Sequence, residues 1–313
     1  MKGKATKGSV LMRIGVIGIG NIAQKAYLPT YLQKQDEADF YFATRNQEVR
    51  RLLKTRYCFQ HVYQNLAELM TEKIEACLIH SATKSHYDLV KTCLENGIHV
   101  FIDKPLTESY RQTEELYQLA AAKNLILMLG FNRRYAPLVK PLKELSDKRQ
   151  LHLQKNRIAG SGTPEFLVYD LFLHLVDTAV YLMPGIPKLI YGNLQVNHSN
   201  LEYATMLLAT ETTSATLTMD LRSGANYERY EVTSPSKTLI LENLTDLTER
   251  NQQGIHQLSG NDWQTTLSKR GFEALVTQFL NALTSKKIVQ QEKTLLSHQL
   301  CAALLANYTN SEA

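Results

Sequence analysis

The chain has 313 residues, of which 44% are hydrophobic and 21% are charged, and its formal net charge is +5. At roughly 150 residues per domain, this length predicts two domains. The lysines and arginines are scattered and form no basic stripe, so we expect no nucleic-acid partner. The sequence has no run of about 18 apolar residues, so we expect no membrane-spanning helix and no membrane partner.

The chain begins with a basic, glycine-containing stretch, residues 1–11, without the apolar core of a signal peptide. We expect this stretch to be a disordered leader. The four cysteines have no CxxC spacing and lie in apolar or helical stretches; they are Cys58, Cys77, Cys93 and Cys301. This pattern favours reduced thiols in a cytoplasmic protein over a disulfide framework.

Residues 12–130 alternate between short apolar runs and amphipathic stretches, which is the rhythm of alternating strands and helices. Strands are predicted at 13–17, 39–44, near Val62, and at 74–80, 98–102 and 125–129; helices are predicted at 21–34, 46–57, 66–70, 86–95 and 110–123. Continuous apolar strands between helices predict a parallel sheet covered on both faces. Because crossovers in such sheets are right-handed, we expect an α/β fold that begins with a doubly wound Rossmann domain.

Residues 131–313 change this rhythm, because strand-like runs follow one another with short turns. Helices are predicted at 137–146, 165–183, 271–283 and 293–308, and strands at 151–156, 189–195, 203–210, 214–220, 230–233 and 238–242. Such closely spaced strands predict a mostly antiparallel sheet in a second, α+β domain. The C-terminal helix is a candidate to pack back on the first domain.

A glycine loop, Gly18-x-Gly20-x-x-Ala23, stands where the first strand turns into the first helix. Small residues there permit a tight turn and let the backbone approach a pyrophosphate, which the helix N-terminus attracts. The motif alone is weak, and a plain structural turn is the alternative, but its place in the first βαβ unit favours dinucleotide binding. Asn21 and Ile22, which begin the helix, are further candidate cofactor contacts.

The end of the second strand bears on the choice of cofactor. NAD enzymes usually place an acidic residue there to bind the adenosine ribose hydroxyls. This chain has Thr44 and Arg45 instead, followed by Asn46, a plausible N-cap. A guanidinium suits a phosphate, so the sequence favours NADP over NAD. The alternative is that Arg45 is an ordinary surface arginine.

Asp103-Lys104-Pro105 follows the predicted strand at 98–102. Ligands of open parallel sheets sit beyond the carboxyl ends of the strands, so Lys104 lies at the edge where chemistry is expected. Pro105 biases the lysine toward an extended backbone. A simple loop charge is the alternative.

These residues resemble the Gfo/Idh/MocA (glucose-fructose oxidoreductase / inositol dehydrogenase) family of oxidoreductases from Arg13 to the C-terminus. The resemblance rests on the motifs Gly18-x-Gly20, Leu28-Pro29, Thr83-x-x-His86, Asp103-Lys104-Pro105, Gly130-Phe131-Asn132-Arg133-Arg134-Tyr135 and Asp170-x-x-x-His174-x-x-Asp177. It implies that Lys104 is a catalytic lysine beside the nicotinamide, and that an open-faced sheet mediates oligomer contacts. The family usually has Glu-Lys-Pro, so Asp103 keeps the charge on a shorter arm.

Asp170 and His174 lie four apart in the predicted helix at 165–183, which places both on one helix face. They are read either as an ordinary polar pair, as a metal pair without a convincing further ligand set, or as a catalytic pair. Oxidation of an alcohol needs a base near neutral pKa, and imidazole is the natural candidate. An adjacent Lys104 would stabilise negative charge on the substrate oxygen. Whether Lys104 or His174 makes the final proton transfer stays open.

Four further residues are candidate contacts. Ser81 and His86 lie near the cofactor side, and a structural role for His86 is equally plausible. Arg133 and Tyr135, at the domain junction, are candidate substrate contacts together with Asp170.

The sequence thus predicts a cytoplasmic NAD(P)-dependent dehydrogenase or reductase, without a metal, acting on a sugar, polyol or related hydroxy or keto compound. We expect a homodimer or homotetramer formed through the second-domain sheet. A nucleotide-binding sensor on the same fold, with no turnover, is the rival hypothesis. Reduction of a biliverdin-like or dihydrodiol substrate is a third possibility, which would require a roomier apolar pocket.

Overall fold

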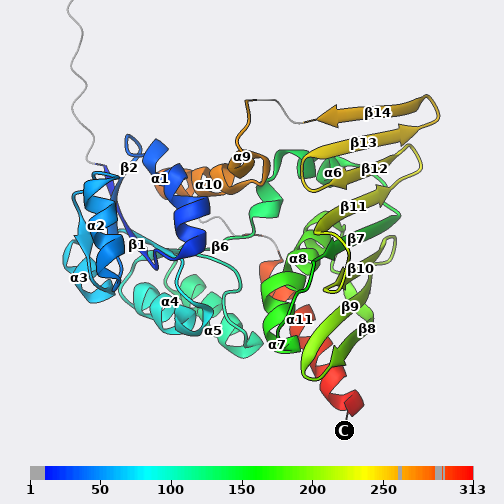
Figure 1. Cartoon of the computed structure of the whole chain (residues 1–313), viewed down its shortest axis with the longest axis horizontal. Coiled ribbons are helices and arrows are strands. Elements are labelled where there is room, and N and C mark those ends of the chain that lie inside the picture. The colour runs from blue at the N-terminus through cyan, green and yellow to red at the C-terminus, as the bar shows by residue number, and fades with distance from the viewer. Residues whose placement is uncertain (1–10, 260–262, 286–290, 292, 313) are drawn as a thin grey trace, which may run out of the picture.

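The computed structural model describes residues 11–259, 263–285, 291 and 293–312. It shows two lobes side by side, with the parallel sheet in one and the large mixed sheet in the other (Figure 1). Residues 1–10 of the expected disordered leader lie outside the described residues. No helix among the described residues is long and apolar enough to cross a membrane.

The first lobe is built on a six-stranded sheet in which every neighbouring pair is parallel. The strands are β1 (Met12–Ile17), β2 (Ala38–Ala43), β3 (Val62–Tyr63), β4 (Ala76–Ile79), β5 (His99–Ile102) and β6 (Leu127–Leu129). Their order, β3-β2-β1-β4-β5-β6, is that of the Rossmann fold, as predicted. The order reverses between β1 and β4, so a ligand crevice is expected at the carboxyl ends of these two strands.

Helical segments connect these strands and cover both faces of the sheet. They are η1 (Ala23–Tyr27), α1 (Leu28–Gln33), α2 (Gln47–Thr55), α3 (Leu66–Thr71), η2 (Thr83–Ser85), α4 (His86–Glu95) and α5 (Tyr110–Ala122). The first helix is not uniform as predicted, because η1 is a π-helical turn. Asn46 caps α2 as expected, since its Oδ1 accepts from the backbone N–H groups of Glu48 and Val49.

The second lobe contains an eight-stranded sheet in the order β14-β13-β12-β11-β7-β10-β9-β8. Its strands are β7 (Gln150–Asn156), β8 (Lys188–Asn197), β9 (Asn200–Ala209), β10 (Ser214–Asp220), β11 (Tyr227–Thr233), β12 (Thr238–Glu242), β13 (Asp246–Asn251) and β14 (Gly254–Ser259). Only β7 and β10 pair in parallel among these strands, so the predicted mostly antiparallel sheet is confirmed. Strands β13 and β14 were missed because their apolar alternation is weak.

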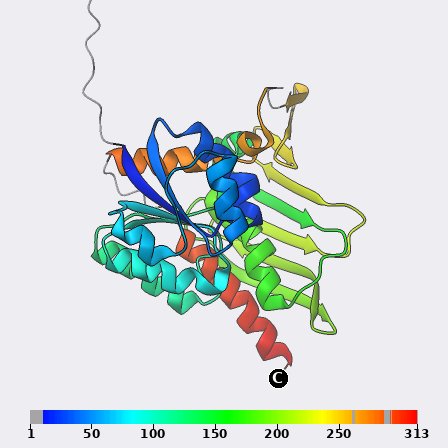
Figure 2. The same cartoon turned by 60° about the vertical axis from the view of Figure 1, so that its left-hand side comes forward.

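Most of the helical segments of the second half lie between this sheet and the first lobe (Figures 1 and 2). They are η3 (Asn132–Tyr135), η4 (Pro137–Val139), α6 (Lys140–Glu144), α7 (Pro164–Leu167), η5 (Val168–Phe172), α8 (Leu173–Leu182), α9 (Thr266–Lys269), α10 (Phe272–Ser285) and α11 (Thr294–Glu312). The described residues form no helix on the opposite face of the sheet, which is therefore open. The single helix predicted at 165–183 is interrupted by the π-helical turn η5.

Two helices from the end of the chain return to the first lobe. Helix α10 places Leu275, Val276 and Phe279 in the same buried cluster as strands β1 and β2. Helix α11 packs on α5, and its His298 accepts a hydrogen bond at Nε2 from the backbone N–H of Leu106 at 3.2 Å. The lobes are therefore joined by a broad apolar contact rather than by a single linker.

A buried ion pair holds the helical layer of the second lobe together. Arg134 donates from Nε and Nη2 to the two carboxylate oxygens of Asp177, at 2.8 and 2.6 Å. Ser297 of α11 donates to the same carboxylate at 3.0 Å. The Asp177 side chain is only 2% exposed, so the charges depend on one another for solvation.

We predict that Asp177→Asn lowers the free energy of unfolding by roughly 3–5 kcal/mol, because it leaves the Arg134 guanidinium buried without a counter-ion. Urea denaturation followed by circular dichroism measures this change. Glu37→Gln is the matched control, because Glu37 pairs with Lys34 on the surface and is 43% exposed. Equal stability of the two variants would contradict the prediction.

Candidate active site

A long crevice runs over the carboxyl ends of strands β1, β2 and β4, as the strand order predicts. Its volume is about 800 Å³, and the predicted contacts Gly18, Gly20, Thr44, Arg45 and Ser81 line it. Gly18 has φ +85°, and a Cβ there would lie 2.3 Å from the backbone nitrogen of Ser81. A side chain at Gly20 would project into open space. The loop therefore presents bare backbone to the crevice, which fits a dinucleotide pyrophosphate.

The end of strand β2 presents a positive side chain to this crevice. Arg45 is the cationic residue of its lining, and no carboxylate belongs to the described lining. The nearby Glu68 is engaged elsewhere, because its carboxylate accepts from the backbone of Gln64 and the side chain of Asn65. A second guanidinium, that of Arg50, donates to the Thr44 carbonyl at 2.7 Å. This corner of the crevice is therefore suited to an anion.

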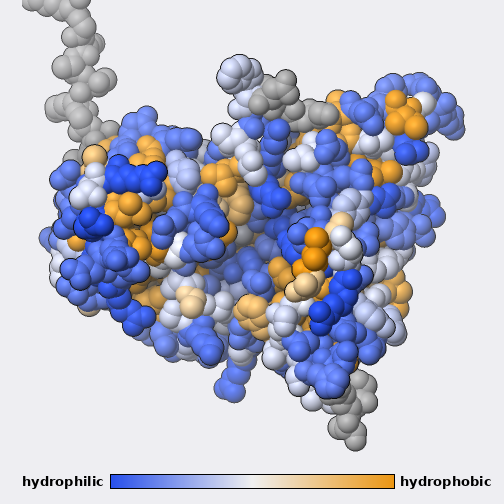
Figure 3. Space-filling model, viewed as in Figure 1, coloured by the Kyte–Doolittle hydropathy of each residue, from blue (hydrophilic) through white to orange (hydrophobic). Residues whose placement is uncertain are grey.

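A second cavity, of about 380 Å³, adjoins the crevice and shares Ser81 and Ala82 with it; we call it the active-site cavity. Both lobes contribute walls, and the predicted residues Lys104, Asp170 and His174 all line it. The space-filling view shows mainly hydrophilic residues in the hollow between the lobes (Figure 3). Three side chains far apart in sequence are thus brought to one polar cavity beside the dinucleotide crevice.

Lys104 crosses from the first lobe to the second. Its Nζ donates to both the carbonyl oxygen and the carboxylate Oδ1 of Asp170, at 2.6 and 2.8 Å. Its side chain is 14% exposed, and the Lys104–Pro105 peptide bond is cis. Two of the three ammonium N–H bonds are thereby fixed, and the third remains for a ligand in the cavity.

Asp103 contacts the backbone of this lysine. Its half-buried carboxylate accepts from the Lys104 backbone N–H at 2.9 Å, and loss of solvent around it raises its pKa. Gly130 leaves the room that this carboxylate occupies, since a Cβ at Gly130 would lie 2.9 Å from Asp103 Oδ1. The short aspartate arm thus fits because residue 130 has no side chain.

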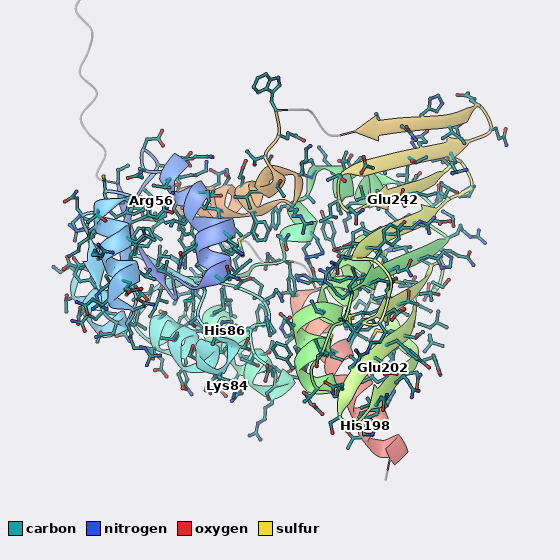
Figure 4. All side chains as sticks on the ribbon, in the orientation of Figure 1. Arg56, Lys84, His86, His198, Glu202 and Glu242 are labelled. Carbon is teal, nitrogen blue, oxygen red and sulfur yellow. The ribbon has the colours of Figure 1, made fainter. Side chains whose placement is uncertain are left out.

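His86 holds the backbone around the cavity. Its Nδ1 lies 2.8 Å from the Pro105 carbonyl oxygen, and its Nε2 lies 2.9 Å from the Ser81 carbonyl oxygen. His86 begins α4 near the centre of the molecule (Figure 4). With both ring nitrogens at backbone carbonyls, the geometry favours the structural role over a hydrogen bond to the cofactor ribose. Ser85 precedes α4 but its side chain does not cap the helix, because its hydroxyl donates to the Ser81 hydroxyl and to the Ala82 carbonyl oxygen.

His174 is oriented by a buried charge network. Arg133 donates from Nη1 to His174 Nδ1 at 2.8 Å, and its Nε and Nη2 bind the Glu228 carboxylate at 2.5 and 2.9 Å. Lys155 donates to the same carboxylate at 2.7 Å. A guanidinium cannot accept a hydrogen bond, so Nδ1 of His174 must be the acceptor. The neutral ring therefore carries its proton on Nε2.

The network also sets the charge states of its members. Burial lowers the pKa of His174 well below its usual value, and the positive charges of Arg133 and Lys104 lower it further. Burial, together with repulsion from Arg133, lowers the pKa of Lys155 to about 7. Arg133 and Lys155 keep the Glu228 carboxylate ionised, so its pKa is lowered despite the opposing effect of burial. His174 is thus uncharged at neutral pH.

The sequence interpretation missed four charged residues of this site: Lys155, Arg157, Glu228 and Arg270. A signal for one pair was present. Leu151, Leu153 and Lys155 alternate on β7, so the lysine occupies a core-facing position. Glu228 lies directly opposite Lys155 on β11. A charged residue at a core-facing position of a strand is unusual, and it indicates a buried ion pair.

Two predicted contacts do not line either cavity. Tyr135 was predicted to bind substrate, but its side chain packs against the buried cluster of the first lobe. Asn21 is exposed at the start of the first helix, between Gly20 and Ile22, and those two neighbours do line the cavities. Arg133 lies in the active-site cavity as predicted. Among the described residues, no group of three or more His, Cys, Asp or Glu is arranged to hold a metal.

The fold and the crevice define a two-domain oxidoreductase with an NAD-binding Rossmann domain. Residues 12–131 match the family described as "Oxidoreductase family, NAD-binding Rossmann fold" (GFO_IDH_MocA), and residues 137–252 match the "YceM-like, C-terminal domain". The chain belongs to the Gfo/Idh/MocA family of oxidoreductases.

Three relatives illustrate the extent of this similarity. The YceM protein of Salmonella typhimurium is 33% identical over 301 residues, which cover 94% of this chain and 97% of that protein. The myo-inositol 2-dehydrogenase of Thermotoga maritima is 29% identical over 185 residues, about half of each chain (55% and 55%). A Gfo/Idh/MocA family oxidoreductase from Vibrio cholerae superposes with a TM-score of 0.88 at 28% identity, covering 96% of this chain and 99% of that one.

We predict that Arg133→Met raises the pKa of His174, because the substitution removes a positive charge that lies against the ring. The rise is partial, since burial of the ring remains. Titration of the ring by NMR measures it, with His174→Gln used to assign the resonance. Arg149→Met, which removes an exposed arginine outside the cavity, is the control and should leave the titration unchanged. An unaltered titration in Arg133→Met would contradict the geometry.

Proposed function

We propose that this protein is an NAD(P)-dependent dehydrogenase or reductase that acts on the CH–OH or keto group of a sugar, polyol or related compound. The main support is the contact between Lys104 Nζ and Asp170 in a cavity that adjoins the dinucleotide crevice. His174 lies in the same cavity. The similarity to a myo-inositol dehydrogenase supports the substrate class.

The side chains of the cavity have distinct roles in this proposal. A bound nicotinamide supplies or accepts the hydride at the substrate carbon. Lys104 directs its remaining N–H toward the substrate oxygen, where it stabilises negative charge and carries the proton that the oxygen gains or loses. Asp170 holds the lysine in place.

His174 acts as a hydrogen-bond donor rather than as the base that the sequence suggested. Its Nδ1 is already an acceptor from Arg133, so a neutral ring has no second lone pair with which to remove a proton. Its Nε2–H donates to the substrate oxygen and fixes the orientation of the substrate. The proton transfer therefore falls to Lys104.

We also propose NADP as the preferred cofactor. Arg45 faces the crevice at the end of β2, where no described carboxylate lines the wall to receive ribose hydroxyls. A 2′-phosphate there would gain charge-assisted hydrogen bonds from the guanidinium.

The chain is proposed to self-associate through the open face of the second-lobe sheet. Two tyrosines on the outer face, Tyr191 of β8 and Tyr203 of β9, are 56% and 42% exposed. A cytoplasmic location suits the cysteines, because Cys77 and Cys93 are in contact and yet unbonded.

We predict that Lys104→Met lowers kcat by roughly 10²–10⁴-fold and that His174→Ala lowers it by roughly 10²–10³-fold. Nucleotide affinity should stay nearly constant in both variants, because neither side chain lines the dinucleotide crevice. Steady-state turnover and nucleotide binding by fluorescence measure the two effects. Lys84→Met is the control, because Lys84 is an exposed lysine outside the cavity (Figure 4). Loss of nucleotide binding with unchanged kcat would disprove these roles.

We predict that Arg45→Ala weakens NADP binding by roughly 10–100-fold, the loss expected for a hydrogen bond to a charged group. Binding of NAD should change little, because it has no 2′-phosphate. Arg56→Ala, which alters an exposed arginine just after α2, is the control (Figure 4). The preference for NADP would be refuted by equal effects on the two nucleotides.

We predict that Tyr191→Glu combined with Tyr203→Glu converts an oligomer to monomers, because carboxylates would be buried at the contact. Size-exclusion chromatography with light scattering measures the mass. A wild-type monomer, or a variant of unchanged mass, would count against assembly through this face.

A further inference from the structure

The active-site cavity is rich in positive charge. Besides the neutral His174, its lining contains five lysine and arginine side chains and two carboxylates, those of Asp103 and Asp170. The cations are Lys104, Arg133, Lys155, Arg157 and Arg270. One more carboxylate, that of Glu228, lies behind the wall and binds two of these cations. Because the pKa of Lys155 is lowered to about 7, this lysine is only partly charged, but the other four cations still outnumber the three carboxylates.

Pairing these charges shows which cations lack a partner. Lys104 binds Asp170, and both Arg133 and Lys155 bind Glu228. Within the described part of the chain, neither Arg157 nor Arg270 has a carboxylate oxygen within 4.0 Å. Asp103 is directed to the backbone N–H of Lys104. The excess charge is therefore located on the guanidinium groups of Arg157 and Arg270.

These two arginines approach the cavity from different elements. Arg157 follows β7, is partly buried, and donates from Nη1 to the Asn156 carbonyl oxygen at 3.2 Å. Arg270 follows α9, and its own carbonyl oxygen accepts from Asn132 at 2.8 Å. Burial lowers the pKa of Arg157, and repulsion by Arg133 and Arg270 adds to this effect, while the more distant carboxylates of Glu228 and Asp170 offset part of it. An arginine held among other cations loses free energy that a bound anion would restore.

We propose that the substrate carries an anionic group, a carboxylate or a phosphate, that binds Arg157 and Arg270 while its reacting carbon lies beside Lys104 and His174. This inference rests on the proposed function and names its substrate class. A volume of about 380 Å³ suits a small acid, and planar guanidinium groups match the oxygens of carboxylate and phosphate. Arg270, which is exposed, would meet the anion first, and the partly buried Arg157 would hold it inside.

Binding of three compounds with one carbon skeleton tests the proposal without requiring turnover. D-glucitol is neutral, D-gluconate has a carboxylate, and D-glucitol 6-phosphate has a phosphate. Isothermal titration of each into the full chain saturated with NADP should show one or both anions binding roughly 10–100-fold more tightly than D-glucitol. Whichever anion binds better identifies the source of the charge. Similar affinities for all three, or no binding of either anion at millimolar concentration, would overturn the proposal.

Substitutions of the two arginines test whether they cause the preference for an anion. Arg157→Gln and Arg270→Gln should each remove most of the preference for the anion, while Arg149→Gln, an equal loss of charge outside the cavity, should preserve it. Circular dichroism and thermal unfolding confirm that each variant folds. If either variant weakens NADP instead of the anion, that arginine serves the cofactor phosphates and the proposal fails. Failure of the proposed function appears differently, as anion binding with no reduction or oxidation of any compound.

Discussion

The contact between Lys104 and Asp170 is the interaction on which the site depends. It joins a loop of the Rossmann domain to the helix that covers the second sheet, and it does so with two hydrogen bonds from one ammonium. The π-helical turn η5 contains Asp170, and such turns recur at functional sites because they widen the helix locally. The same contact therefore bridges the two domains and aims the lysine at the cavity.

The orientation of the His174 imidazole depends on residues that do not themselves line the dinucleotide crevice. Glu228 on β11 binds both Arg133 and Lys155, and only the fixed guanidinium can hold His174 through Nδ1. Two buried cations around one carboxylate are tolerated because hydrogen bonds satisfy that carboxylate, including one from the Tyr230 hydroxyl. Glu228 is thus a positioning residue, since it acts on the substrate only through Arg133 and His174.

Much of this arrangement is readable from the sequence because its signals are local. The glycine loop is defined by contiguous residues, and Lys104 is placed at the edge of the sheet by the strand that precedes it. The pairing of Lys155 with Glu228 is different, because it requires the register between β7 and β11, which are more than seventy residues apart. The π-helical turns were also beyond prediction, since a regular apolar period does not reveal one added residue in a helix.

The position of Tyr135 outside the cavity has a geometric cause that also explains how the two domains are joined. Residues 132–135 form the 3-10 helix η3, in which successive side chains point about 120° apart. Arg133 therefore enters the active site, Arg134 turns to Asp177 and the C-terminal helix, and Tyr135 packs into the first lobe.

The short helix η3 thus contributes one side chain to the active site, one to the helical layer of the second lobe and one to the contact between the lobes. The two arginines are adjacent in sequence and yet act on separate networks, because their carboxylate partners lie on different elements. Substitution of Asp177 should therefore lower the stability of the fold. Substitution of Glu228 should instead alter the orientation of the His174 imidazole, so the two effects are separable by mutation.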